Sequence, residues 1–221
     1  MSSILNDQEL ARYLELTLVR GDATGADVAQ LCQQAKRLSA AAVVVCSSRV
    51  ELARTRLENS PVKVSALIGY PFGTGATDAK RYEVEVAVDD GAQELDVVFN
   101  LGLLKDGADR QLFRELRDVV EAADERPVKF LLEICRMTPE EISRAVKLVM
   151  EAGALGISPG TGFEPGEPSL DDFKHLIAAV GDHVATKAMA QTVTLDRVRE
   201  WVEAGVHRVG VCQLPESLAA L

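Results

Sequence analysis

Two charged residues occur in apolar segments, where an isolated charge would be costly. Asp96 interrupts the run ELDVVF at 94–99, and Lys187 follows HVAT at 183–186. Burying either charge alone carries a large free-energy penalty, so each residue needs a partner or a chemical role. The two could pair, and a lysine that loses its proton near neutral pH becomes a nucleophile toward carbonyl compounds. They could equally be a structural ion pair or surface residues, so the spacing alone predicts no more than a candidate enzyme.

Short β-branched runs alternate with amphipathic segments, and this pattern predicts the elements that hold the two residues. Strands are expected at 13–19, 41–46, 62–68, 94–100, 128–134, 155–158, 183–187 and 208–212. Helices are expected after a cap at Asp22 or Thr24, at 50–57, 77–89 and 110–123, after Thr138, and at 170–180, 195–204 and 214–221, with a short leading helix at 5–13.

Near-continuous hydrophobic strands that alternate with helices imply a parallel sheet, and eight such units are the number that closes a barrel. We therefore predict an α/β fold, a single (β/α)8 barrel domain over residues 1–221. A doubly wound open sheet is the alternative. It lacks support because no G-x-G-x-x-G follows the first strand.

Composition indicates which binding partners and which cellular compartment to expect. The formal charge of −10 argues against binding to nucleic acid or to an anionic membrane surface. Four scattered cysteines without a C-x-x-C pair, no evident signal peptide and no long apolar run predict a cytoplasmic protein. The three histidines lie in different units without metal-ligand spacing, so neither a metal nor another cofactor is expected.

Side chains at the carboxyl ends of barrel strands face the active site, and this rule extends the set of candidates. They are Glu15 and Thr17 on the first strand, Arg49 after the second, Glu133 and Arg136 after the fifth, Ser158, Thr161 and Gly162 after the sixth, Gln191 after the seventh and Gly210 on the eighth. The two arginines could hold a carboxylate or phosphate by bidentate contacts, or they could be surface residues.

Six segments together resemble the deoxyribose-phosphate aldolase family. They read LTLVRGDAT (16–24), KVSALIGYPFG (63–73), GAQELDVVFNLGLLKDG (91–107), PVKFLLEICRMTPEEI (127–142), EAGALGISPGTGF (151–163) and VATKAM (184–189). The resemblance implies class I aldol chemistry without a metal. In that chemistry one lysine forms an imine with the donor aldehyde, while an aspartate and a second lysine handle protons. It places the aspartate on Asp96 and the second lysine on Lys187, and Glu15 approximately matches an early acidic residue. Because dimers are common in the family, a homodimer is expected.

The segment that should carry the imine-forming lysine departs from the family pattern. The family motif usually reads V-K-T-S-T-G-F, whereas this chain reads ISPGTGF at 157–163, which aligns the lysine with Ser158. A serine hydroxyl cannot form an imine, so the family mechanism cannot run unchanged.

The glycine-rich loops that hold the substrate phosphate in the family are also altered. Ala190 and Gln191 stand where the family has a glycine pair, and CQLP at 212–215 replaces a serine-bearing loop. Gly162 and Gly210 remain. Side chains in such a cradle obstruct the close approach of a phosphate.

Three interpretations follow from these departures. The first is a divergent carbon–carbon lyase for small aldehydes or ketones, with Lys187 as the imine former and Asp96 as the proton shuttle. The second is a barrel enzyme in which Asp96, Lys187 and Glu133 perform acid–base chemistry on a non-phosphorylated substrate. The third is a non-catalytic homologue that binds a metabolite or a protein.

Overall fold

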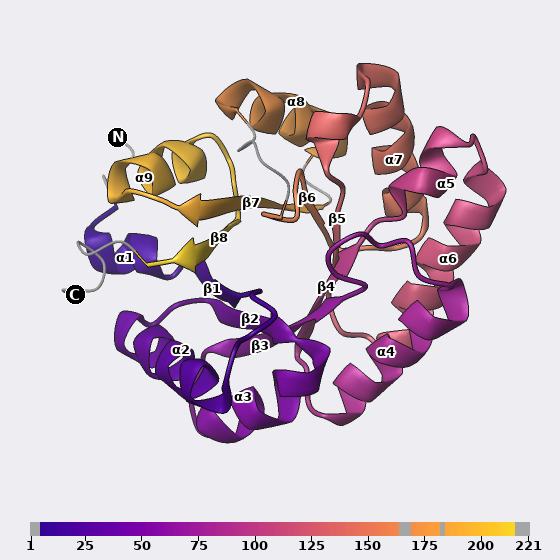
Figure 1. Ribbon diagram of the computed structural model, residues 1–221. Coiled ribbons are helices and arrows are strands. Elements are labelled where there is room, and N and C mark those ends of the chain that lie inside the picture. Colours follow the sequence, from indigo (N-terminus) through magenta and orange to yellow (C-terminus); the bar gives the residue numbers. More distant parts are fainter. Residues whose placement is uncertain (1–4, 164–168, 182–183, 215–221) are drawn as a thin grey trace.

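The computed structural model describes residues 5–163, 169–181 and 184–214, and it confirms the predicted (β/α)8 barrel (Figure 1). The strands are β1 (Leu14–Leu18), β2 (Ala42–Cys46), β3 (Lys63–Ile68), β4 (Glu94–Val98), β5 (Val128–Leu131), β6 (Gly156–Ser158), β7 (Ala185–Thr192) and β8 (Arg208–Gln213). Neighbouring strands pair in parallel, and β1 pairs with both β2 and β8, which closes the sheet.

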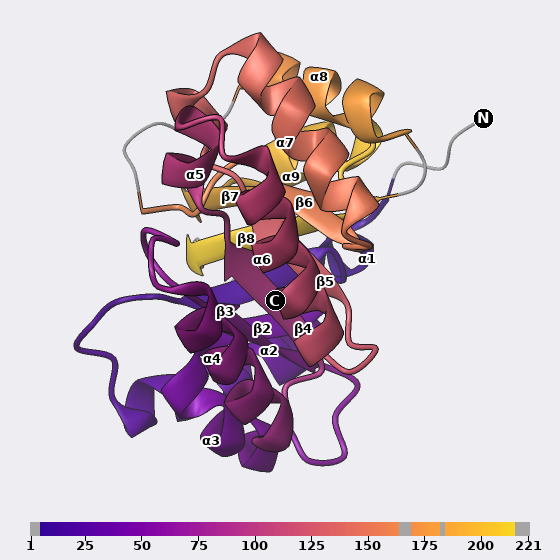
Figure 2. The same ribbon diagram turned by 90° about the vertical axis from the view of Figure 1, so that its right-hand side faces the viewer.

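Helices surround the barrel, as the side view in Figure 2 also shows. They are α1 (Asp7–Ala11), α2 (Gly25–Leu38), α3 (Val50–Arg56), α4 (Thr77–Asp89), α5 (Leu101–Lys105), α6 (Asp109–Ala122), α7 (Pro139–Glu151), α8 (Leu170–Val180) and α9 (Leu195–Glu203), with short 3-10 turns η1 (Ser47–Arg49) and η2 (Ile134–Arg136). The short helix α5 was not predicted. The predicted closing helix at 214–221 lies almost entirely outside the described residues.

Local capping explains where several helices begin. Thr24, Thr138 and Ser169 each accept a hydrogen bond from the backbone three residues later, and the acidic residue at that position binds the cap backbone in return. This reciprocal capping box satisfies two backbone N–H groups that would otherwise lack partners. In α7 the first helical residue is Pro139, whose fixed backbone angle suits that position. The helix predicted to begin after Thr138 is therefore confirmed.

The strands present apolar side chains on both faces. Outward-facing residues such as Val43, Val64 and Leu95 belong to the main core between barrel and helices. Trp201 of α9 is completely buried in this layer, where the centroid of its ring lies 5.5 Å from that of Phe173. Such two-sided burial is expected of a parallel barrel.

The barrel interior contains a second, smaller apolar layer toward the carboxyl ends of the strands. It consists of one residue from each of four neighbouring strands, Val44, Leu67, Val98 and Leu131. Since inward-facing residues alternate along a strand, Val98 lies one layer above Asp96, and Leu131 one layer above Lys129.

A buried lysine holds the loop after β3 against β4. Lys80 Nζ donates to the carbonyl oxygens of Gly73 and Val98, at 2.8 and 3.0 Å, and pairs with Glu115 at 2.7 Å. Gly73 has a φ of +67°, and a Cβ there would lie 2.4 Å from the carbonyl oxygen of Phe99, so only glycine fits. These contacts fix the loop that carries Pro71 and Phe72 at the barrel mouth.

In the described part of the chain, no helix is both long and apolar enough to cross a membrane.

Candidate active site

Asp96 and Lys187 meet inside the barrel. The Lys187 ammonium contacts Asp96 Oδ2, and its Nζ lies 2.5 Å from Glu15 Oε2. Lys129 Nζ lies 3.0 Å from Glu15 Oε1 and 3.2 Å from Asp96 Oδ1. All four side chains are almost completely buried. We call these four residues the interior charge cluster.

Residues on neighbouring strands complete the partners of this cluster. Glu94 binds Lys129 at 2.6 Å, Arg208 approaches Glu15 at 3.5 Å, and Ser65 donates to Asp96 at 3.2 Å. Glu15, Glu94 and Asp96 carry three formal negative charges, which Lys129, Lys187 and Arg208 balance. Buried charges persist only when paired in this way.

The barrel register explains how the cluster fits. Asp96 pairs with Lys129, and Lys129 in turn pairs with Gly156. A Cβ on Gly156 would lie 2.2 Å from Lys129 Cγ, so the missing side chain provides the space through which Lys129 reaches the centre. A residue larger than glycine at this position would push Lys129 out of the cluster.

The contacts within the cluster favour the charged forms of Glu15, Lys129 and Lys187. Burial raises the pKa of Glu15, but Lys129 and Lys187 outweigh burial and lower that pKa to about 2. Burial lowers the pKa of Lys187, yet Asp96 and Glu15 more than compensate and raise it above the ordinary lysine value. Lys129 behaves in the same way, and carboxylates raise its pKa. Lys187 is therefore an ammonium at neutral pH.

Ser158 lies beside this cluster at the end of β6. Its hydroxyl is fully buried and donates to the carbonyl oxygen of Gly160 at 2.9 Å. The β6–β7 register pairs Gly156 with Ala185 and Ile157 with Thr186, so the next pair in this register is Ser158 and Lys187. The position at which the resemblance expects an imine-forming lysine is thus adjacent to the Lys187 side chain.

Met189 fills the side of the barrel mouth on which Gly162 and Gly210 lie. A Cβ on Gly210 would lie 2.4 Å from Met189 Sδ, and a Cβ on Gly162 would lie 3.1 Å from Met189 Cε. Gln191 Nε2 donates to the Gly162 carbonyl oxygen at 2.5 Å. The two glycines predicted to bind substrate are therefore covered by a thioether side chain, and Gln191 binds protein backbone.

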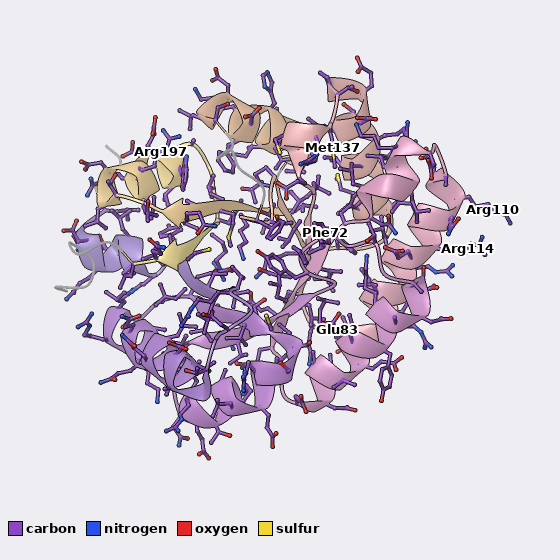
Figure 3. All side chains as sticks on the ribbon, in the orientation of Figure 1. Phe72, Glu83, Arg110, Arg114, Met137 and Arg197 are labelled. Atoms are coloured by element: carbon purple, nitrogen blue, oxygen red, sulfur yellow. The ribbon has the colours of Figure 1, made fainter. Side chains whose placement is uncertain are left out.

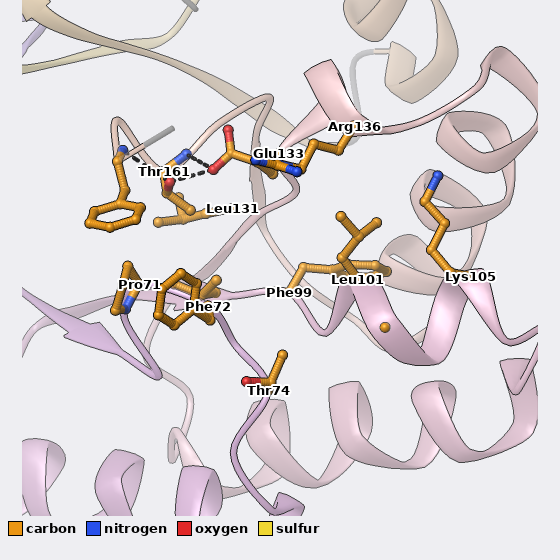
Figure 4. Close-up of a pocket in the computed structure, with 13 residues that line it drawn as sticks. Pro71, Phe72, Thr74, Phe99, Leu101, Lys105, Leu131, Glu133, Arg136 and Thr161 are labelled. Carbon is orange, nitrogen blue, oxygen red and sulfur yellow. Dashed lines mark hydrogen bonds between the residues drawn. The ribbon is translucent and has the colours of Figure 1, made fainter. Parts of the chain in front are cut away.

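A pocket opens on the other side of the mouth, between the ends of β3, β4 and β5 (Figure 4). Its volume is about 360 Å3, and it is lined by Pro71, Phe72, Thr74, Val98, Phe99, Leu101, Gly102, Lys105, Leu131, Glu133, Arg136, Thr161 and Phe163. In Figure 3 Phe72 lies over the middle of the barrel, whereas Arg110 and Arg114 extend outward from α6. Val98 and Leu131 belong to the apolar layer directly above the interior charge cluster.

Glu133 and Thr161 form the polar wall of the pocket. Glu133 Oε2 accepts hydrogen bonds from the Thr161 hydroxyl and, at 3.3 Å, from its backbone N–H (Figure 4). Glu133 has a φ of +61° and a ψ of +57°, a left-handed conformation that is rare for a residue with a side chain. Strain of this kind is concentrated at functional sites.

The predicted site residues therefore separate into groups. The structure brings Asp96, Lys187 and Glu15 together, and it places Glu133, Arg136 and Thr161 at the pocket. Two others have roles within the protein: Arg49 donates to the carbonyl oxygen of Ala23 at 3.2 Å, and the Thr17 hydroxyl donates to that of Glu15 at 3.1 Å.

The site residues predicted from the sequence did not include Lys129, Met189, Phe72 or Phe163. Lys129 had the same signal as Asp96, a charge within an apolar strand, VKFLL at 128–132. Met189 and Phe72 gave no signal, because apolar residues near strand ends are usual in a barrel core.

A parallel eight-stranded barrel with ionisable residues on the inner faces of its strands defines a class of barrel proteins, many of them enzymes. Comparison with known proteins is more specific. A model of the family described as DeoC/LacD family aldolase matches residues 10–164. The chain belongs to this family.

Individual relatives agree with this assignment. A deoxyribose-phosphate aldolase of Clostridium botulinum (strain Kyoto / Type A2) is 36% identical over 202 residues, which cover 91% of this chain and 95% of the relative. One from Thermococcus kodakarensis is 37% identical over 210 residues, covering 93% and 94%. A crystal structure of a putative deoxyribose-phosphate aldolase from Coccidioides immitis matches with a TM-score of 0.88 and 29% identity, covering 94% of this chain and 83% of that one.

Proposed function

We propose that this chain is a carbon–carbon lyase for small aldehydes or ketones. In this proposal the Lys187 ammonium acts as a general acid beside Asp96. The observation that carries the proposal is the position of the Lys187 ammonium, buried between Asp96 and Glu15. An ammonium has no lone pair with which to attack a carbonyl carbon, but it can stabilise an enolate and donate a proton. Membership of the aldolase family supports the reaction type.

The reaction needs no covalent intermediate. In the cleavage of a β-hydroxy carbonyl compound, Asp96 takes the hydroxyl proton as the carbon–carbon bond breaks. The electron pair of that bond passes to the other fragment as an enolate, whose oxygen the Lys187 ammonium stabilises. Return of one proton to the enolate carbon completes the second carbonyl product and restores the cluster.

Substrate would have to approach the interior charge cluster from the pocket between the ends of β3, β4 and β5, which we call the mouth pocket. Asp96 and Lys187 are only 0% and 1% exposed, and the layer that contains Val98 and Leu131 lies between them and the pocket. The proposal therefore requires the reacting carbonyl group to move these apolar side chains aside. Enclosure of this kind strengthens electrostatic interactions once the substrate is bound.

An imine at Lys187 is the alternative mechanism. It requires the amine to lose its proton while two carboxylates lie against it, and this arrangement raises the pKa of Lys187. A non-catalytic, metabolite-binding role is the second alternative, and the near-complete burial of the cluster favours it.

One experiment separates the three possibilities. The protein is incubated with acetone or acetaldehyde in D2O, and exchange of the protons on the carbon next to the carbonyl is followed by NMR. A parallel sample is treated with borohydride, which reduces an imine to a stable adduct detectable by peptide mass. Exchange without an adduct supports the proposed chemistry, whereas exchange with an adduct on Lys187 establishes the imine mechanism. Absence of both leaves a binding role.

The assembly of the protein is a separate proposal. All described strands belong to one closed barrel, which supports a single domain. We infer a homodimer from the family resemblance. A structure from Aeropyrum pernix with a TM-score of 0.87 and 24% identity, covering 97% of this chain and 89% of that one, is described as a unique tetrameric structure of deoxyribose phosphate aldolase. Light scattering after size-exclusion chromatography would distinguish these states.

A further inference from the structure

We propose that the mouth pocket selects a carbonyl substrate with an uncharged alkyl or aryl chain and without a phosphate group. This inference rests on the proposed carbonyl chemistry, because it assigns the substrate class of the same site. Its basis is the pocket, the exposed aromatic rings beside it, the balance of charges around it and the position of Met189 over Gly162 and Gly210.

The lining of the pocket suits an apolar chain. Aliphatic surface comes from Pro71, Val98, Leu101 and Leu131. Phenylalanine rings form much of the rest of the lining. At about 360 Å3 the pocket is at the lower end of the volumes that hold small ligands. Because its floor adjoins the layer above Asp96 and Lys129, a chain held here would direct its carbonyl end toward the interior charge cluster.

Two large aromatic side chains at the rim of the pocket are exposed to solvent, and a bound ligand would cover them. Phe72 is 61% exposed and Phe163 is 50% exposed, although both are large and apolar. Their rings meet edge to face with centroids 5.4 Å apart, and Tyr70 contacts Phe163 at 6.0 Å in the same manner. Clustered exposed rings beside a pocket are typical of a surface that binds an apolar group.

The charges around the pocket favour an uncharged ligand. Lys105 and Arg136 supply two positive charges, but Glu133 lines the same wall and Glu141 binds Lys105 Nζ at 2.5 Å. The formal charges of these four residues sum to zero. A neutral ligand therefore meets no excess charge, and Glu133 can accept a hydrogen bond from a substrate hydroxyl.

Among the described residues on the opposite side of the mouth, a side chain covers the two glycines at which a phosphate could approach the backbone. Met189 contacts both remaining glycines, Gly162 and Gly210, and the Gln191 side chain lies against Gly162, where its Nε2 donates to the carbonyl oxygen. A phosphate cradle needs backbone N–H groups that the anion can approach closely. The substrate chain is thus directed to the β3–β5 side.

Binding of stable probes tests the inference without requiring turnover. Dissociation constants are measured by titration NMR for 4-phenyl-2-butanone, for acetone, for 4-phenylbutanoate and for inorganic phosphate. We expect the aryl ketone to bind at least about 10-fold more tightly than acetone, and more tightly than the carboxylate. Phe72→Ala and Phe163→Ala should each weaken the aryl ketone by about 5- to 10-fold, because each removes apolar contact area.

Tyr82→Ala is the matched control, since Tyr82 is 65% exposed on α4 and does not line the pocket. It should leave all four constants unchanged. Equal binding of aryl ketone and acetone, tighter binding of phosphate or carboxylate, or equal effects of the Phe72 and Tyr82 substitutions would overturn the inference. If the aryl ketone binds as expected but no proton exchange occurs, the proposed function fails while the substrate class stands.

Discussion

Lys187 and Asp96 are 91 residues apart in the sequence, yet their side chains are in contact inside the barrel. They belong to β7 and β4, which are not neighbouring strands. The contact therefore crosses the barrel interior, and both partners are buried. Among the described residues, Glu15, Lys129 and Ser65 also contact this pair, and a substrate that enters the cluster would meet the same groups.

Asp96→Asn should remove most of the proton-exchange activity proposed for the enzyme. An amide cannot accept the hydroxyl proton, so exchange into acetone or acetaldehyde should fall by at least about 100-fold. Glu94→Gln is the matched control, because Glu94 binds Lys129 but not Lys187; its effect should be within a few-fold. A melting curve shows that each variant is folded. Wild-type exchange rates in folded Asp96→Asn would refute the role of this carboxylate.

Ser158→Lys should create an imine-forming site. The new amine would lie next to the Lys187 ammonium, and a neighbouring positive charge lowers the pKa of a lysine, which favours the neutral nucleophile. Borohydride treatment with acetaldehyde should then give an adduct on the peptide that contains residue 158. Ser158→Met has a similar length but no amine and should give none. Adducts confined to surface lysines in Ser158→Lys would contradict the placement of this position in the site.

The sequence alone was sufficient to predict the barrel and to single out Asp96 and Lys187. Alternation of hydrophobic strands with amphipathic helices depends on local periodicity, which the sequence records directly. Asp96 and Lys187 stood out because a charge within an apolar strand needs a partner. Lys129 carried the same signal and could have been included on the same argument.

Other features depend on side-chain direction and backbone geometry, which periodicity does not specify. Met189 faces inward because β7 continues to Thr192, beyond the predicted end of that strand. Glu133 leaves β5 in a left-handed conformation, whereas the sequence predicted strand as far as residue 134. The short helix α5 begins at the Asn100 cap and is only five residues long, too short for an amphipathic repeat to be recognised.

Met189→Ala combined with Gln191→Gly should open the phosphate side of the mouth. The double variant removes the thioether from Gly162 and Gly210, and it removes the Gln191 side chain that lies against Gly162. Inorganic phosphate, which should not bind the wild type detectably at millimolar concentration, should give a measurable dissociation constant by calorimetry. The buried methionine also contributes to packing, so the free energy of unfolding should fall by about 2–5 kcal/mol. Phosphate binding equal in both proteins would show that Met189 does not block the cradle.

Lys80→Met should destabilise the barrel mouth. It leaves the Glu115 carboxylate, which is 2% exposed, without its cation and frees the carbonyl oxygens of Gly73 and Val98. Breaking a buried ion pair costs about 3–5 kcal/mol of unfolding free energy. The double variant Lys80→Met/Glu115→Leu removes the orphaned charge and should recover much of that loss in urea denaturation. An equal loss in both would mean that the bonds to the loop carbonyl groups, rather than the ion pair, dominate.

Stability should also decline in acid because of Glu15. The pKa of Glu15 is depressed from 4.5 to about 2 in the folded protein, where Lys129 and Lys187 overcome the opposing effect of burial. The group therefore stabilises the fold fully above pH 4.5, and this contribution is lost as the pH falls toward 2. In that window the unfolded chain binds one more proton at this site, which steepens the decline by up to about 1.4 kcal/mol per pH unit.

Urea denaturation of the wild type and of Glu15→Gln at several pH values tests this contribution. The variant should be less stable at neutral pH, because it leaves Lys129 and Lys187 with one carboxylate fewer, but its stability should fall less steeply with decreasing pH. Glu58→Gln, at an exposed position, should follow the wild-type curve. Parallel pH profiles for the wild type and Glu15→Gln would show that Glu15 titrates equally in the folded and unfolded chains, and that the cluster does not hold it as a carboxylate.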